Sequence, residues 1–104
     1  MVVNPKAELI EITPIGDVVW RELVHVRGKV RSMRVQPWAG VATLEVTVYD
    51  ETGGIVVVFT GRRSIPGITL GREIEVSGRS NRHRGYLSLV NPHYKLIGPS
   101  AAHT

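Results

Sequence analysis

Three basic side chains recur at every second position of the stretch HVRGKVRSM, which contains Arg27, Lys29 and Arg31. In a β-strand, alternate residues lie on one face and are about 6.6–6.8 Å apart. This repeat is close to the phosphate spacing of an extended single strand, so the three cations could contact successive phosphates. The alternative is a solvated strand face whose cations pair with Glu45 of the next strand. Because one acid cannot neutralise three cations, the pattern favours a phosphate-binding surface.

Two aromatic residues near these cations are candidates for stacking with bases. Trp38 lies beside Pro37 and Gly40 in the expected loop between the first two strands, and its alternative role is a lid over the core. Tyr49 faces outward by the alternation of its strand, and its alternative role is packing against a neighbouring strand. A third aromatic residue, Trp20, is expected to pack on the N-terminal segment.

More arginines occur in two later parts of the chain. A glycine-flanked loop holds Arg62 and Arg63, which could bind a phosphate or stack on a base, although one of the two is expected to cap strand carbonyls. The segment 79–86 is expected to form a basic hairpin across the same groove, or a hairpin that is merely solvent-exposed. The complete set of candidate nucleic-acid-binding residues is Arg27, Lys29, Arg31, Arg34, Trp38, Tyr49, Arg62, Arg63, Arg79, Arg82, Arg84 and Tyr86.

Length and composition limit the possible architectures. A chain of 104 residues allows one small domain, and 42% hydrophobic and 21% charged residues are ordinary for a globular protein. The positive charge is concentrated in the segments 21–34 and 61–85, which form a strongly basic patch if the fold brings them together. No transmembrane helix or secretory signal is expected. The absence of cysteine fits a cytoplasmic protein.

Apolar segments with period-two alternation, separated by glycine and proline, predict five strands. The expected strands span residues 20–35, 41–49, 55–60, 72–80 and 86–90, and the last could continue to residue 97. Gly28, at an inward position of the first strand, predicts a bend, a bulge or a close approach of backbone. The third strand is apolar on both faces, so it should be central or covered. Residues 61–71 should form a loop or a single helical turn, and residues 81–85 a hairpin loop.

A closed barrel is the favoured architecture, because closure removes the exposed edges of five short strands. The long first strand with its mid-strand glycine, and the connection between the third and fourth strands, predict a five-stranded Greek-key barrel, the OB-fold. An SH3-like small barrel is the alternative. The OB-fold domain is expected at residues 20–97, with residues 1–19 as a lead segment that packs on the barrel and residues 98–104 as a flexible tail.

The segments HVRGKVRSM, VYDETGGIVVVF, LGREIEVSGR and YLSLVNPHYKL occur in the order typical of nucleic-acid-binding OB domains. Over about residues 20–97 the chain resembles the OB wedge domain of RecG-type helicases. It more closely resembles small stand-alone OB-fold proteins of actinobacteria, in which a GRR-x-I-x-GI segment follows the third strand; here that segment is GRRSIPGI, residues 61–68. The resemblance implies nucleic-acid binding in repair or recombination. The chain departs from such domains at residues 58–60, where they often have an aromatic pair or a tryptophan.

The sequence contains no motif that indicates an enzyme. There is no nucleotide-binding or metalloprotease motif, the four histidines lack metal-ligand spacing, and no cofactor is expected. We therefore expect a binding protein and not an enzyme, with single-stranded nucleic acid as its ligand, DNA more than RNA, and little sequence preference. The alternative is an OB-fold module for protein interaction or homodimerisation, which the apolar third strand and the sparse aromatic residues favour. No membrane partner is expected.

Overall fold

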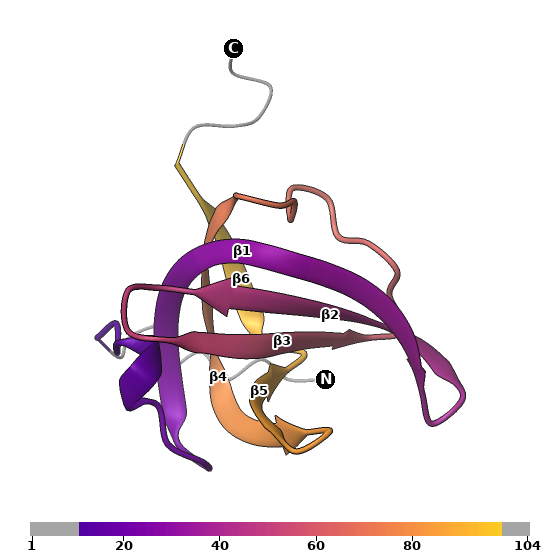
Figure 1. Ribbon diagram of the computed structural model, residues 1–104, viewed down its shortest axis with the longest axis horizontal. Helices are drawn as coiled ribbons and strands as arrows, with labels where there is room; N and C mark the ends of the chain where they lie inside the picture. Colours follow the sequence, from indigo (N-terminus) through magenta and orange to yellow (C-terminus); the bar gives the residue numbers. More distant parts are fainter. Residues whose placement is uncertain (1–10, 99–104) are drawn as a thin grey trace.

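The computed structural model describes residues 11–98, which form an all-β domain (Figure 1). A short 3-10 helix precedes six strands, and the connection between the third and fourth strands contains turns but no helix. No helix among residues 11–98 is long and apolar enough to cross a membrane. The elements are η2 (Ile15–Asp17), β1 (Leu23–Trp38), β2 (Val41–Tyr49), β3 (Gly54–Thr60), β4 (Glu73–His83), β5 (Tyr86–Val90) and β6 (His93–Ile97).

Five of the strands close into a barrel. The strand order is β1-β2-β3-β5-β4, and β1 also pairs with β4 to complete the circle. All these pairings are antiparallel except that of β3 with β5. This order confirms the predicted five-stranded Greek-key barrel. It also places β3 between two neighbours, as its apolar residues on both faces predicted.

The fifth strand, β5, occupies the predicted residues 86–90, but it does not continue to residue 97. The chain turns at Asn91, which has a φ of 48°, and β6 then pairs with the first half of β4. At the other end, Ile15 and Val18 are buried, and the amide of Thr13 donates a hydrogen bond to the carbonyl of His25 at 2.8 Å. Residues 1–10 of the expected lead segment, and residues 99–104 of the expected tail, lie outside the described residues.

β1 is a strongly curved strand that belongs to two parts of the barrel (Figure 1). Residues 23–29 pair with β4, and residues 29–38 pair with β2. At the bend, Gly28 approaches the end of β2 so closely that a Cβ atom would lie 2.4 Å from the carbonyl oxygen of Tyr49. The bend therefore requires glycine, in agreement with the close approach predicted from its position in the middle of the strand.

Two tight turns are shorter than the loops predicted for them. Ala39–Gly40 joins β1 to β2, Arg84–Gly85 joins β4 to β5, and all four residues have positive φ. Two successive residues in this region form a type I′ turn, whose twist matches that of antiparallel strands. Consequently Trp38 is the last residue of β1, and Arg82 and His83 are the last residues of β4, so none of the three lies in a loop.

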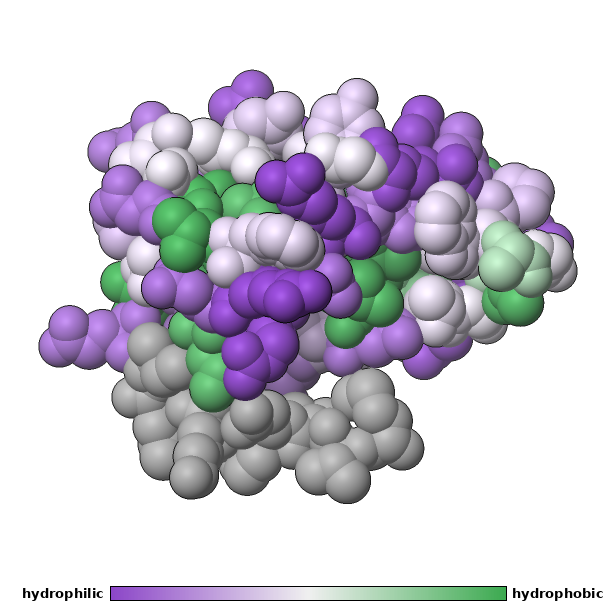
Figure 2. All heavy atoms as spheres, turned by 90° about the horizontal axis from the view of Figure 1, so that it is seen from below, coloured by the Kyte–Doolittle hydropathy of each residue, from purple (hydrophilic) through white to green (hydrophobic). Residues whose placement is uncertain are grey.

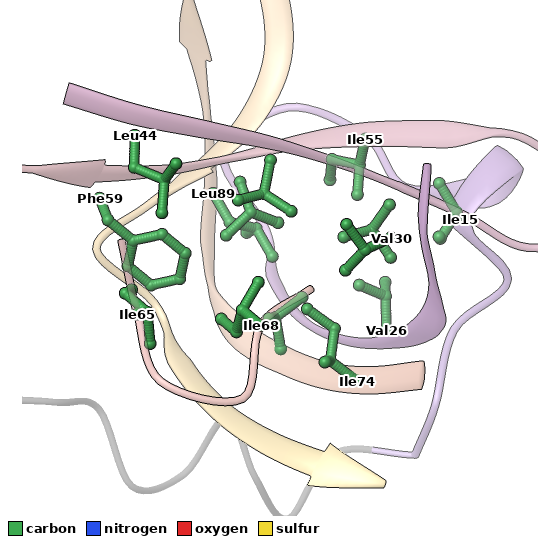
Figure 3. Packing of buried hydrophobic residues seen from close by; sticks show 14 of the residues in the cluster. Ile15, Val26, Val30, Leu44, Ile55, Phe59, Ile65, Ile68, Ile74 and Leu89 are labelled. Atoms are coloured by element: carbon green, nitrogen blue, oxygen red, sulfur yellow. The ribbon is translucent and has the colours of Figure 1, made fainter. Parts of the chain in front are cut away.

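Aliphatic side chains from all five barrel strands fill the interior (Figure 3). Two further isoleucines, Ile65 and Ile68, come from the connection between β3 and β4, and both are buried. Ile65 lies beside Phe59, whereas Ile15 of η2 lies at the opposite side of the cluster. The isoleucines of the segment GRRSIPGI therefore complete the core, and each contributes about 1.5–3 kcal/mol by its burial.

Candidate nucleic-acid interface

A groove of about 540 Å³ lies on the outer face of β2 and β3. The second half of β1 borders it on one side, and the hairpin formed by β4 and β5 borders it on the other. Apolar atoms of Val56 and Leu87 contribute to its surface, so the groove offers an apolar area between charged side chains. The charged and aromatic residues that line it are Arg34, Glu45, Tyr49, His83, Arg84 and Tyr86.

One buried carboxylate holds the two sides of the groove together. Glu45 is only 6% exposed, and its two oxygens are contacted by three basic side chains. The Nε of Arg34 donates to one oxygen at 3.1 Å, and the Nε of Arg84 donates to the other at 2.9 Å. The Nε2 of His83 lies 2.8 Å from that second oxygen. We refer to Glu45, Arg34, His83 and Arg84 as the Glu45 clamp, which connects β1, β2 and the β4–β5 hairpin.

The pKa of Glu45 reflects two opposing effects. Burial disfavours its charged form and by itself raises the pKa, but the hydrogen bonds from His83, Arg84 and Arg34 outweigh burial and lower the pKa below its ordinary value. The pKa of Asp50 is also lowered, although burial opposes this as well. Its carboxylate accepts hydrogen bonds from the backbone amides of Ile15, Thr52 and Gly53 and from the Thr52 hydroxyl.

These lowered pKa values predict a loss of stability in acid. A carboxyl whose pKa is depressed by folding stabilises the protein fully above its unfolded pKa, and this contribution is lost as the pH falls through the folded pKa. The ordinary values are 4.5 for Glu45 and 3.8 for Asp50, so the free energy of unfolding should fall with pH below about 4.5.

Urea unfolding at several pH values between about 6 and 3 measures this effect. The variant Glu51→Gln, which removes an exposed carboxylate of the β2–β3 turn, serves as the control and should keep the pH dependence of the wild type. A free energy of unfolding that stays constant over this range would contradict the assignment of Glu45 and Asp50 as stabilising carboxylates.

Trp38 packs against the β4–β5 hairpin; it does not line the groove, and it does not belong to the apolar core. Its ring centroid lies 4.6 Å from that of His83, and the guanidinium of Arg84 lies 4.9 Å from the indole centroid. Arg84 also donates from Nη2 to the carbonyl of Pro37 at 2.7 Å. The indole is 43% exposed, so part of it remains available for contact with a ligand.

The three alternating cations of β1 do not pair with Glu45, the arrangement considered as the alternative to phosphate binding. Arg27 donates from Nε to Glu73 at 3.0 Å, and its Nη1 lies 3.8 Å from Glu75, both on β4. Glu45 does not face these cations, because Arg27 lies opposite Glu75 of β4 and Lys29 lies opposite Tyr49 of β2. The residue of β1 that lies opposite Glu45 is Arg34. Lys29 and Arg31 form no ion pair within residues 11–98.

Lys29 and Arg31 border a second hollow of about 670 Å³, which meets the groove at Tyr49. The guanidinium of Arg31 lies 5.3 Å from the centroid of the Tyr49 ring, which is 41% exposed. Three acids, Asp50, Glu51 and Glu73, line the same hollow and offset its three cations. The first half of β1 is therefore not the uncompensated basic surface that its alternation predicted.

Arg34 reaches the groove because of a β-bulge that no local pattern indicated. Arg31 is an extra residue in β1, since Val30 and Ser32 pair with successive residues of β2. Strict alternation from the first half of the strand would direct Arg34 into the core. The bulge shifts the alternation by one residue, so Met33 packs against the core and Arg34 faces the groove.

The remaining predicted residues fall into separate places. Tyr86 lines the groove and is 65% exposed. Arg63 borders a different hollow of about 310 Å³ beside Pro37, and Arg62 is exposed in the loop that follows β3. Arg79 and Arg82 do not line the groove; Arg79 is exposed on β4, and Arg82 contacts Trp20.

Two residues make contacts that the sequence pattern did not indicate. His83 is 5% exposed and belongs to the Glu45 clamp, although it was expected in a solvated loop. The ring of Trp20 lies under the guanidinium groups of Arg21 and Arg82, which the sequence did not predict. Its expected packing on the N-terminal segment stays a prediction, because residues 1–10 lie outside the described residues. The one signal in the sequence is the dipeptide Arg84–Gly85, if it is read as a two-residue type I′ turn. In that reading β4 continues to His83, and the alternation of the strand then places the His83 side chain.

No protein-family model matches the sequence, and none of the curated proteins is significantly similar to it. Several solved structures are similar in fold. An OB domain from Thermoplasma acidophilum has a TM-score of 0.67 and 18% identity, over 86% of this chain and 89% of that domain. The second OB-fold domain of replication protein A from Methanococcus maripaludis has a TM-score of 0.66 and 15% identity, over 85% and 96%. RecG bound to a three-way DNA junction has a TM-score of 0.68 and 15% identity, over 89% of this chain but only 13% of RecG.

At these identities the likeness concerns the fold alone, and the resemblance to stand-alone actinobacterial proteins stays a prediction. The fold assignment also has support that does not depend on these neighbours, namely the strand order of this chain. The closed order β1-β2-β3-β5-β4 and the similarity to these domains together establish that the chain is an OB-fold domain.

Proposed function

We propose that this protein binds single-stranded nucleic acid, DNA more than RNA, in the groove on β2 and β3, and that it acts by binding and not by catalysis. OB domains bind oligonucleotides on the face of these two strands, between the loops that follow the first and fourth strands. The observation that carries the proposal is the groove itself, in which arginines and exposed tyrosines flank a floor that contains Val56 beside Thr47 and Glu45. RecG and replication protein A, two proteins with a similar domain, lend support. A cytoplasmic location is part of the proposal.

The proposed mechanism combines phosphate contacts with stacking. Arg34 contacts Glu45 through Nε alone and is 59% exposed, so its terminal amino groups can donate to a phosphate. Arg31 and Lys29 extend this row along β1. The exposed parts of Tyr49 and Tyr86 offer ring faces on which bases can stack. Stacking of this kind does not depend on the nucleotide sequence, because every base has a π-face.

The first test is a titration of labelled oligo-dT at several salt concentrations. With about four phosphates contacted, the log–log salt slope should be near −3, and the affinity should fall about fifty-fold between 50 and 200 mM salt. Arg31→Ala should reduce the slope by about 0.7. Tyr86→Ala should cost about 1–3 kcal/mol of binding free energy, the usual contribution of one stacked base.

The matched control is Arg62→Ala, which removes the same charge from an exposed position outside the groove. It should leave the affinity within about a factor of two, since Arg62 lines neither the groove nor the hollow that meets it at Tyr49, and exposed charges are screened by salt. A flat salt response, or equal losses in Arg31→Ala and Arg62→Ala, would refute binding in the groove.

A second candidate function is protein interaction or homodimerisation at the tip of the β1–β2 hairpin. Val35, Trp38 and Val41 are each about two-fifths exposed there, and a small hollow lies beside Pro37 and Arg63. The test is the elution volume of the wild type compared with that of Val41→Lys. A dimer that the lysine dissociates would favour this function, whereas a monomer in both cases would argue against it.

A further inference from the structure

The β4–β5 hairpin carries a cation–aromatic cluster on each of its two faces. On the groove side, His83 and Arg84 contact Trp38. The preceding residue, Arg82, points the other way, because successive residues of a strand face opposite sides. Its guanidinium lies 5.0 Å from the centroid of Trp20, so the two tryptophans of the chain flank one hairpin.

The turn that carries Trp20 is fixed in place by β4. Ser80 is 1% exposed, and its hydroxyl accepts a hydrogen bond from the amide of Glu22 and donates one to the carbonyl of Val19. Its backbone amide and carbonyl form two more bonds, to the carbonyl of Glu22 at 2.7 Å and from the amide of Arg21 at 3.2 Å. These four bonds hold Arg21 at a φ of 67°, a strained conformation for a non-glycine residue. The position of Trp20 and Arg21 is therefore preorganised.

Three guanidinium groups surround this turn. Arg21 lies 4.5 Å from the centroid of Trp20, Arg82 lies over the same ring, and Arg79 donates from Nη1 to the carbonyl of Arg21 at 3.1 Å. None of the three forms an ion pair within residues 11–98, although Glu22 belongs to the same turn. Guanidinium groups that stack on an indole keep their charge and present N–H donors at their edges, an arrangement suited to phosphate oxygens.

The position of this cluster relates it to the groove. Strongly hydrophilic side chains gather in the middle of the face seen from below (Figure 2), and this is the side of the barrel on which Figure 1 shows the β4–β5 hairpin. Because Arg82 and Arg84 are two residues apart, a strand that leaves the groove past Arg84 needs only to pass the hairpin tip to reach Arg82 and Trp20. All three arginines of the cluster are exposed.

We propose that Trp20, Arg21, Arg79 and Arg82 form a second polynucleotide-binding patch, which contacts the phosphates of a strand that continues from the groove around the β4–β5 hairpin. This inference rests on the proposed function of the groove. The open surface and the spread of its cations along β4 and the turn fit an extended polyanion, and the half-exposed ring of Trp20 fits a stacked base.

The test compares oligo-dT of about 6 nucleotides, which the groove alone can hold, with oligo-dT of about 20 nucleotides, longer than the ~4–16 nucleotides of one OB-fold site. The variant Arg21→Gln/Arg82→Gln should lose on the order of tenfold in affinity for the long strand at low salt, and its salt slope should be smaller by about 1.4. Its affinity for the short strand should be unchanged. Arg31→Ala, in contrast, should weaken the binding of both lengths.

Tryptophan fluorescence gives a second readout that does not depend on affinity. In Trp38→Phe, Trp20 is the only remaining tryptophan, and its emission should change on addition of the long strand but not of the short one. Equal losses at both lengths, no loss at either, or an unchanged Trp20 emission would overturn the second patch. If the wild type fails to bind even the short strand, the groove proposal itself is wrong, so the two failures are distinguishable. Thermal unfolding of each variant confirms that it is folded.

Discussion

Replacing Gly28 with alanine is expected to lower the free energy of unfolding by about 3 kcal/mol or more. The new Cβ atom would lie 2.4 Å from the carbonyl oxygen of Tyr49 and 2.8 Å from Cγ1 of Val48. A neighbouring backbone carbonyl cannot give way as the end of a flexible side chain can, so β1 and β2 would have to separate at the bend. A loss of this size is a large part of the ~5–15 kcal/mol that stabilises a typical domain.

The matched control is Gly78→Ala, at another mid-strand glycine of the barrel. There a Cβ atom would meet Cβ of Pro92 at 3.6 Å, which is ordinary van der Waals contact, so the change should stay within about 1 kcal/mol of the wild type. Urea unfolding of both variants measures the difference. Equal stabilities of Gly28→Ala and Gly78→Ala would show that the bend of β1 does not depend on glycine.

The second large effect is expected for Glu45→Ala, which should destabilise the protein by about 2–4 kcal/mol. Breaking a buried ion pair by removing one partner costs about 3–5 kcal/mol, because the other charge is left without compensation. The partly exposed Arg34 and Arg84 can be hydrated in the variant, which reduces the cost. His83, at 5% exposure, cannot be hydrated without opening the hairpin.

Removing the charge of Glu45 should lower the stability of the protein but raise its affinity for nucleic acid. In Glu45→Gln the shape of the side chain is kept, but Arg34 and Arg84 lose their counter-charge and become stronger partners for phosphate. We therefore expect lower stability together with an affinity for oligo-dT that rises several-fold at low salt. The control Asp17→Asn changes the net charge equally at an exposed position that lines neither the groove nor the second hollow, and it should alter neither quantity measurably.

Urea unfolding and oligo-dT titration of these two variants at about 50 mM salt measure both quantities. If both affinity and stability fall in Glu45→Gln, the Glu45 clamp holds the groove residues in position, and the charge of Glu45 does not weaken phosphate binding by Arg34 and Arg84. If Asp17→Asn raises affinity as much as Glu45→Gln does, net charge alone accounts for the effect.

The strands and the core followed from local pattern. The alternation around Val46 predicted β2 at the residues that it occupies, 41–49. The apolar segment 55–60 predicted a covered third strand, and Gly28 predicted a close approach of backbone. These features depend on the pleat of a β-strand, which places successive side chains on opposite faces. They also depend on the space available for a side chain at a given position, which only glycine fits where two backbones approach closely. Such constraints are present in the sequence itself.

Other features of the site depended on which strands become neighbours. The acids that neutralise Arg27 lie on β4 because the barrel closes there, and Glu45 instead meets His83, which is 38 residues away in the sequence. The bulge at Arg31 decides that Arg34 faces the groove. These arrangements result from register and closure, which depend on the whole set of strands.

The amino-acid sequence by itself determined an all-β barrel with an outer surface rich in arginine. The tertiary structure alone decided which of those arginines pair with an acid and which cluster with an aromatic ring. The reason is that a charge is neutralised only by groups within a few ångströms of it in space. It therefore placed Trp38 against Arg84 on one face of a single hairpin and Trp20 against Arg82 on the other.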